Sequence, residues 1–122
     1  AGRDVDLFDY ARAHQERLLL KPNRDYGGAG VVFGNETRAA EWDAALAEAA
    51  DEPYGTVVQT AVPVYSERYP VVEGDRVEHR SYYNIAGFSG TPHGLATLAR
   101  MARGKIINIT RDGGVAGVLT CT

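Results

Sequence analysis

The chain has 122 residues, of which 44% are hydrophobic and 24% charged, so it can bury one ordinary core and disorder is excluded. The formal net charge is −3 and no basic tract occurs, which argues against a nucleic acid or an anionic membrane surface as a partner. No apolar run approaches the roughly 20 residues that a membrane span requires. The N-terminus also lacks the basic segment followed by an apolar segment that marks a signal peptide. We therefore expect a cytoplasmic protein with no membrane partner.

The first third of the sequence predicts a helix followed by a hairpin. Apolar residues at helical spacing predict a helix over residues 4–17, and the apolar run Leu18–Pro22 predicts a buried strand with Lys21 near its end. Residues 23–30 are rich in turn formers and predict a glycine loop, and residues 30–34 predict the returning strand.

The middle of the chain predicts one more helix and one more strand. Asn35 or Thr37 can cap a helix that continues to about Ala50, with Trp42 on its apolar stripe as a core residue. The β-branched run over residues 56–62 predicts a strand.

The second half predicts mainly strands. In chain order we expect a hairpin of residues 65–72 and 76–83, a loop over 87–94, a short helix over 95–102, and strands over 105–110 and 115–120. The whole order predicts an α+β fold, in which helices lie on one side of a mainly antiparallel sheet. We expect a single domain over residues 1–122.

A phosphate-binding hairpin is the first chemical prediction. A polyphosphate requires a positive point charge and several backbone N–H donors that uncluttered residues can bring close, and Lys21 with the glycine run at residues 27–30 supplies both. No Gly-Lys-Ser or Gly-Lys-Thr follows, so this is not a Walker loop. The alternative is a plain glycine-rich hairpin with a solvated lysine.

Three segments in order resemble one family. The sequence LLKPNRDYGGAGV at residues 19–31 resembles the lysine strand and glycine loop of the circularly permuted bacterial ATP-grasp enzymes related to glutathionylspermidine synthase. Residues 57–62 resemble the strand that lines the adenine pocket of those enzymes, and residues 106–115 resemble their asparagine-containing strand and glycine turn. The resemblance implies an ATP-grasp-like lobe that binds ATP and Mg²⁺.

The resemblance also implies roles for the nucleotide-binding residues. Lys21 would hold the α- and β-phosphates, and the loop glycines would cover the β- and γ-phosphates as a mobile lid. The strand at residues 59–62 would present backbone groups to the adenine. The implied nucleotide-binding residues are Lys21, Gly27, Gly28, Gly30, Gln59, Ala61 and Val62.

The metal site implied by the resemblance departs from the family pattern. Asn108 would bind Mg²⁺ through its amide oxygen, and Asn84 stands where relatives often have an acid. Many ATP-grasp enzymes have a glutamate two residues before the asparagine, but Ile106 occupies that position here. Glu78 is the nearest carboxylate in the sequence to Asn84.

Three arginines are candidates for stabilising the charge that develops during phosphoryl transfer, because a guanidinium can pair with two oxygens at once. Arg111 is the preferred candidate since it follows Asn108 by three residues and precedes a glycine turn. Arg80 and Arg100 are the others, and a surface salt bridge is the alternative for each of them.

The sequence leaves two main functions open. The first is the ATP-binding portion of a carboxylate-amine ligase that acts through an acylphosphate, with ATP and a carboxylate and an amine as substrates. The second is a degenerate, non-catalytic nucleotide-binding or protein-interaction module, which Ile106 and Asn84 favour. We expect the chain to be a fragment of a larger two-lobe enzyme, in which either a second lobe or a second copy of the chain covers the exposed sheet.

Overall fold

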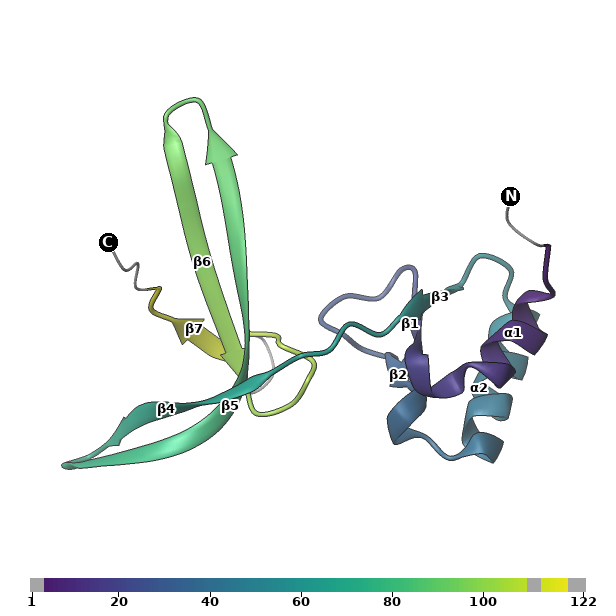
Figure 1. The fold of residues 1–122 in the computed structure, drawn as a ribbon, viewed down its shortest axis with the longest axis horizontal. Coiled ribbons are helices and arrows are strands. Elements are labelled where there is room, and N and C mark those ends of the chain that lie inside the picture. The colour runs from purple at the N-terminus through teal and green to yellow at the C-terminus, as the bar shows by residue number, and fades with distance from the viewer. Residues whose placement is uncertain (1–3, 110–112, 119–122) are drawn as a thin grey trace. The chain divides into compact units, whose positions relative to one another are not determined.

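The computed structural model of the protein describes residues 4–109 and 113–118. It divides into two compact units, Ala1–Val62 and Pro63–Thr122. The fold is α+β, as the sequence predicts: the first unit holds both described α-helices and a three-stranded antiparallel sheet, and the second holds a four-stranded antiparallel sheet (Figure 1).

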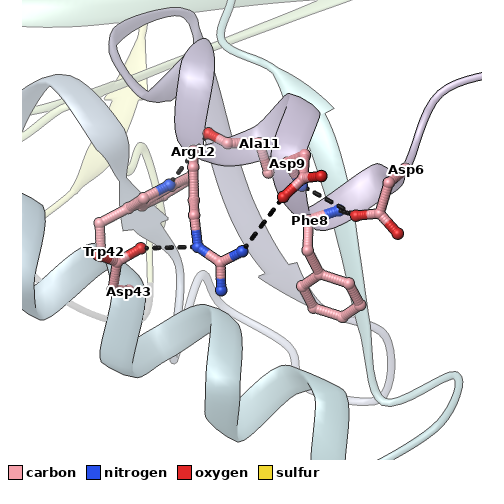
Figure 2. Close-up of polar contacts among 7 residues, drawn as sticks. All are labelled: Asp6, Phe8, Asp9, Ala11, Arg12, Trp42 and Asp43. Atoms are coloured by element: carbon pink, nitrogen blue, oxygen red, sulfur yellow. Dashed lines mark hydrogen bonds and ion pairs between the residues drawn. The ribbon is translucent and has the colours of Figure 1, made fainter.

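The first helix, α1 (Leu7–Ala13), is shorter than the helix predicted over residues 4–17. Asp6 caps it, since its carboxylate accepts hydrogen bonds from the backbone N–H groups of Phe8 and Asp9 at 2.9 and 3.0 Å (Figure 2). A 3₁₀ turn at Gln15–Arg17 then leads directly into the first strand.

The first sheet has the order β2-β1-β3, and all of its pairings are antiparallel. Its strands are β1 (Leu18–Pro22), β2 (Val32–Phe33) and β3 (Thr56–Thr60). The pairing of β1 with β2 confirms the predicted hairpin around the glycine loop, and β1 has the predicted bounds.

The second helix, α2 (Ala39–Asp51), supplies the core of the first unit. Trp42 and Leu46 are each 1% exposed and pack with Leu18 and Leu20, which point to the same side of β1. The indole Nε1 donates to the carbonyl of Ala11 at 3.1 Å, so the one tryptophan also ties α2 to α1 (Figure 2). The prediction that Trp42 is a core residue is confirmed.

The predicted caps of α2 are wrong, because the helix begins later. Its N-cap is Arg38, whose backbone N–H donates to the carboxylate of Glu41 at 3.3 Å and whose guanidinium pairs with the same group. The hydroxyl of Thr37 is already used, since it donates to the carbonyl of Phe33 at 2.7 Å across the 3₁₀ turn Gly34–Glu36.

The second sheet has the order β4-β5-β6-β7. Its strands are β4 (Ser66–Glu73), β5 (Arg76–Thr91), β6 (Gly94–Ala102) and β7 (Gly114–Ala116). The first half of β5 pairs with β4 and the second half pairs with β6, so β5 and β6 extend past the other two strands as a hairpin (Figure 1). The predicted hairpin of β4 and β5 is confirmed.

Two predictions within this hairpin are wrong. The predicted loop over residues 87–94 is strand as far as Thr91, and only Pro92 and His93 form the turn. The predicted helix over residues 95–102 is the strand β6. Although leucine and alanine favour helices, nine consecutive residues there pair with β5, and this tertiary pairing overrides the local preference.

The strand predicted over residues 105–110 is not formed over 105–109, the part that the structure describes. Met101 of β6 pairs with Gly114 of β7, so the chain must reverse direction between them and offers residues 105–109 no neighbouring strand. The backbone N–H of Gly113 closes this reversal by donating to the carbonyl of Asn108 at 3.1 Å. Only the start of the strand predicted over residues 115–120 forms, as β7: residues 117 and 118 are not in a strand, and residues 119 and 120 lie outside the described part of the chain.

Candidate nucleotide site

Lys21 lies near the end of β1 with an exposed side chain. Side chains alternate along a strand, so Lys21 points away from the face that Leu18 and Leu20 pack against α2. Its direct partner on β3 is Val57, and Gln59 pairs with Leu19, which places Lys21 and Gln59 on the same face of the sheet. Lys21 forms no ion pair with any residue in the described part of the chain, so its charge is available to a ligand.

The loop after Lys21 uses its glycines for conformations that other residues avoid. Gly27, Gly28 and Gly30 have φ angles of +72°, +74° and +67°, in the left-handed region. The hydrogen bond from Ala29 N–H to the carbonyl of Tyr26 is long, at 3.4 Å. The backbone of this loop can therefore come close to a ligand, as the prediction for the three glycines requires.

Asn23 fixes the near end of the glycine loop. Its backbone N–H donates to the carbonyl of Gly55 and its side-chain amide donates to the carbonyl of Tyr54, each at 2.8 Å. The first bond extends the β1–β3 pairing one step past Pro22. Lys21 and the loop are thus anchored to the turn that precedes β3.

The open edge of β3 supplies backbone groups next to this face. Ala61 was predicted to meet the adenine, but its N–H donates to the carbonyl of Arg17 at 2.9 Å, inside the sheet. Because backbone groups alternate in direction along an antiparallel strand, Thr60, the last residue of β3, presents its N–H and C=O groups to the open edge instead. Thr60 lies within the segment predicted to meet the adenine, residues 59–62, whereas Val62 follows the end of β3.

A pocket of about 390 Å³ lies on the other face of the first sheet, between the glycine loop and α2. Gly30 is part of its wall, but its charged lining consists of Asp25, Glu48 and Glu52, and Lys21 is not part of it. Three carboxylates would repel a triphosphate. The face that carries Lys21 is therefore the better place for phosphates, although Gly30 packs against Pro22 and Asp25 on the opposite face.

In the second unit, the guanidinium of Arg80 is held by two glutamates. It donates to both carboxylate oxygens of Glu73, one of them at 2.7 Å, and to Glu78 at 2.9 Å. These hydrogen bonds raise the pKa of Arg80 and lower that of Glu73. The alternative of a surface salt bridge thus describes the contacts of Arg80, and a phosphate would have to compete with both glutamates.

Asn84 lies on β5 beside a carboxylate that the sequence analysis missed. Its side-chain amide donates to the hydroxyl of Tyr69 at 3.0 Å and to the carboxylate of Glu67 at 3.3 Å. Burial, followed by the hydrogen bond to Glu67, raises the pKa of Tyr69. Because Asn84 uses its N–H₂ group in these contacts, its amide oxygen is directed elsewhere. The two-residue turn at Gly74 and Asp75 sets the register that brings Glu67 close to Asn84. This turn, and with it the register, could have been predicted from the sequence.

The two remaining site predictions concern the loop before β7. Asn108 is half-buried in this loop, and Gly113 packs between the carbonyl oxygens of Asn108 and Met101, the residue that pairs with Asn84. Arg111 lies outside the described residues.

No protein-family model, curated protein or solved structure matches this chain.

Neither a protein-only metal centre nor a spanning helix is found in residues 4–109 and 113–118. No three His, Cys, Asp or Glu side chains come together there to hold a metal ion. None of the helices in these ranges has the length and apolar character needed to cross a bilayer. A Mg²⁺ ion at Asn84 or Asn108 would therefore need further oxygen ligands.

Proposed function

We propose that the chain is the ATP-binding portion of a cytoplasmic, ATP-dependent carboxylate-amine ligase of the ATP-grasp type. The observation that carries this proposal is the free, exposed Lys21 beside a loop with three left-handed glycines. A point charge and mobile backbone N–H groups on one hairpin are what a polyphosphate requires. Lys21 would hold the α- and β-phosphates, and Gly27, Gly28 and Gly30 would cover the β- and γ-phosphates.

The adenine would lie against the open edge of β3. Thr60 directs its backbone groups to this edge, Val62 follows directly after β3, and Gln59 shares the face of Lys21. Backbone N–H and C=O groups can bind the edge of an adenine regardless of which side chains the strand carries. Gln59, in place of the glutamate that ATP-grasp enzymes often have, is therefore compatible with binding. Arg111 and Arg80 remain the proposed groups for stabilising charge during transfer.

Asn84 and Asn108, both in the second unit, remain the proposed ligands of Mg²⁺. Their amide oxygens are hard ligands, and magnesium typically combines such ligands with one or two carboxylates and water. Because Asn84 turns its N–H₂ group to Glu67, its amide oxygen faces away from that carboxylate, and the carboxylate ligand of the metal would come from elsewhere. The substrate carboxylate would attack the γ-phosphorus and release ADP, and the amine would then displace phosphate from the acylphosphate to form the amide.

The contacts of Arg80 favour a second candidate, a non-catalytic nucleotide-binding or interaction module. Glu73 and Glu78 already neutralise this arginine, and Ile106 stands in place of the family's metal-binding glutamate. A module of this kind would bind ATP through Lys21 without depending on magnesium.

Calorimetric titration of ATP, with and without Mg²⁺, separates these functions. Lys21→Ala should weaken ATP binding by about ten-fold or more, the size of one charge-assisted phosphate contact. Arg17→Ala is the matched control, because it removes an exposed cation from the same unit and leaves the glycine hairpin intact. Tighter binding with Mg²⁺ supports the ligase, and equal binding without it supports the module. Equal losses in both variants would refute a phosphate site at Lys21.

A further inference from the structure

The two faces of the second sheet differ in charge. Directly paired residues share a face, so the registers of β4, β5 and β6 assign every side chain to one side. All three glutamates of these strands lie on the face of Asn84, which we call the Glu67 face: Glu67, Glu73 and Glu78. Arg76 and Arg80 lie on that face as well and balance most of this charge.

The opposite face, which we call the Arg100 face, carries cations and hydroxyl groups. Over the described strands β4 to β7 it has no aspartate or glutamate. Its polar side chains are Ser66, Arg68, His79, Ser81, Tyr83, Ser89, Thr91 and Arg100. A sheet face with guanidinium groups and without carboxylates attracts anions.

Arg100 is the most exceptional residue of this face. It is half-buried on β6, where its direct neighbours are Ile85 on β5 and Val115 on β7. It forms no hydrogen bond or ion pair through its side chain with any described residue, in contrast to Arg80 on the Glu67 face. A partly desolvated charge flanked by apolar side chains lacks compensation until an anion joins it.

Arg68 adds a second cation to the same face. One of its guanidinium nitrogens donates to the carbonyl of His79 at 3.4 Å, at the long limit of a hydrogen bond, and no carboxylate pairs with it among the described residues. It stands opposite Ser81, while Tyr83 stands opposite Ser66 on one side and Ala102 on the other. Hydroxyl donors thus lie on the strand between the two arginines.

We propose that the Arg100 face binds a small-molecule phosphate, with Arg100 as the principal ligand and Tyr83 and Ser81 as further donors, while Arg68, whose guanidinium turns toward His79, adds positive charge to the face without contacting the phosphate. A guanidinium can donate two parallel hydrogen bonds to phosphate oxygens, and hydroxyls donate one each. The face belongs wholly to the second unit, so this inference does not rest on the proposed nucleotide role of Lys21.

The test uses the Lys21→Ala chain, so that binding does not report on the glycine hairpin. Inorganic tripolyphosphate is titrated while amide chemical shifts are followed by NMR, with citrate as a second probe that carries carboxylates instead. Shifts should concentrate on the strands around Ser81, Tyr83 and Arg100, and tripolyphosphate should bind more tightly than citrate. Tighter binding of citrate would overturn the assignment to phosphate.

Charge-removing variants then separate a site from general surface charge. Arg100→Gln should weaken tripolyphosphate binding by about ten-fold, the loss of one charge-assisted pair, and Arg100→Lys should keep a large part of the affinity. Arg76→Gln is the matched control, because it removes an exposed arginine from the Glu67 face of the same sheet. Equal losses in Arg100→Gln and Arg76→Gln would overturn the proposal. The proposal would also be overturned if, in the chain with its arginines intact, the chemical-shift changes occurred away from the Arg100 face. This second result does not depend on how the arginine variants fold.

Discussion

Leu46→Ala should destabilise the first unit strongly, because Leu46 is 1% exposed and packs in the small core around Trp42. The change deletes three carbon atoms, each worth about 0.8 kcal/mol when buried, and the cavity that remains raises the expected loss to about 3 kcal/mol. A unit of this size has a total stability of roughly 3–9 kcal/mol. The substitution therefore removes a third of that stability or more.

Urea unfolding followed by tryptophan fluorescence measures this loss, since Trp42 is the one tryptophan of the chain and lies in the affected core. Leu7→Ala is the control, because Leu7 belongs to the same unit but is 55% exposed, and it should change the free energy of unfolding by under about 0.5 kcal/mol. A loss below about 1 kcal/mol for Leu46→Ala, or similar losses in both variants, would refute the assignment of this core.

Two further predictions concern backbone packing and an ion pair. Gly34→Ala should lower the stability of the fold by about 3 kcal/mol, because its new Cβ would lie 1.9 Å from the carbonyl oxygen of Gln15. Gly104→Ala is the control and should be neutral, since open space surrounds Gly104. Equal melting temperatures for the two variants would contradict this. Hydrogen bonds from Arg80 lower the pKa of Glu73 below its ordinary value of 4.5. The ion pair therefore stabilises the fold fully above pH 4.5 and loses its effect as the pH falls through the lowered pKa of Glu73. Circular dichroism of Glu73→Gln should therefore show a stability deficit at neutral pH that closes in acid, and a deficit that stays constant with pH would refute the assignment.

The parts of the fold that local pattern determines could be predicted from the sequence. Leu18–Pro22 forms the expected buried strand, and Trp42 lies in the core. Both follow from local patterns, an apolar run that ends at a proline and an apolar stripe at helical spacing, which predict the element and its buried side without knowledge of distant residues. The helix predicted over residues 95–102 failed because its leucines and alanines suit a helix locally, while the choice between helix and strand was made by pairing with β5.

The site predictions divide in the same way. The glycine loop could be recognised because left-handed backbone strongly favours glycine, although Tyr54 also adopts it, with a φ of +66°. The partners of Arg80 and Asn84 could not be recognised from neighbours in sequence, since Glu73 and Glu67 lie on the adjacent strand and approach only through the register of the hairpin. The half-buried, unpaired state of Arg100 likewise depends on which strands flank β6.

The measurement that tests the central claim most directly is the calorimetric titration of ATP into the wild-type chain and into Lys21→Ala under identical conditions. The account predicts saturable binding to the wild type, weakened by about ten-fold or more in the variant, because Lys21 is an exposed cation beside the glycine loop that forms no ion pair with the described residues. Saturable binding that is unchanged in Lys21→Ala, or no binding to the wild-type chain, would contradict it.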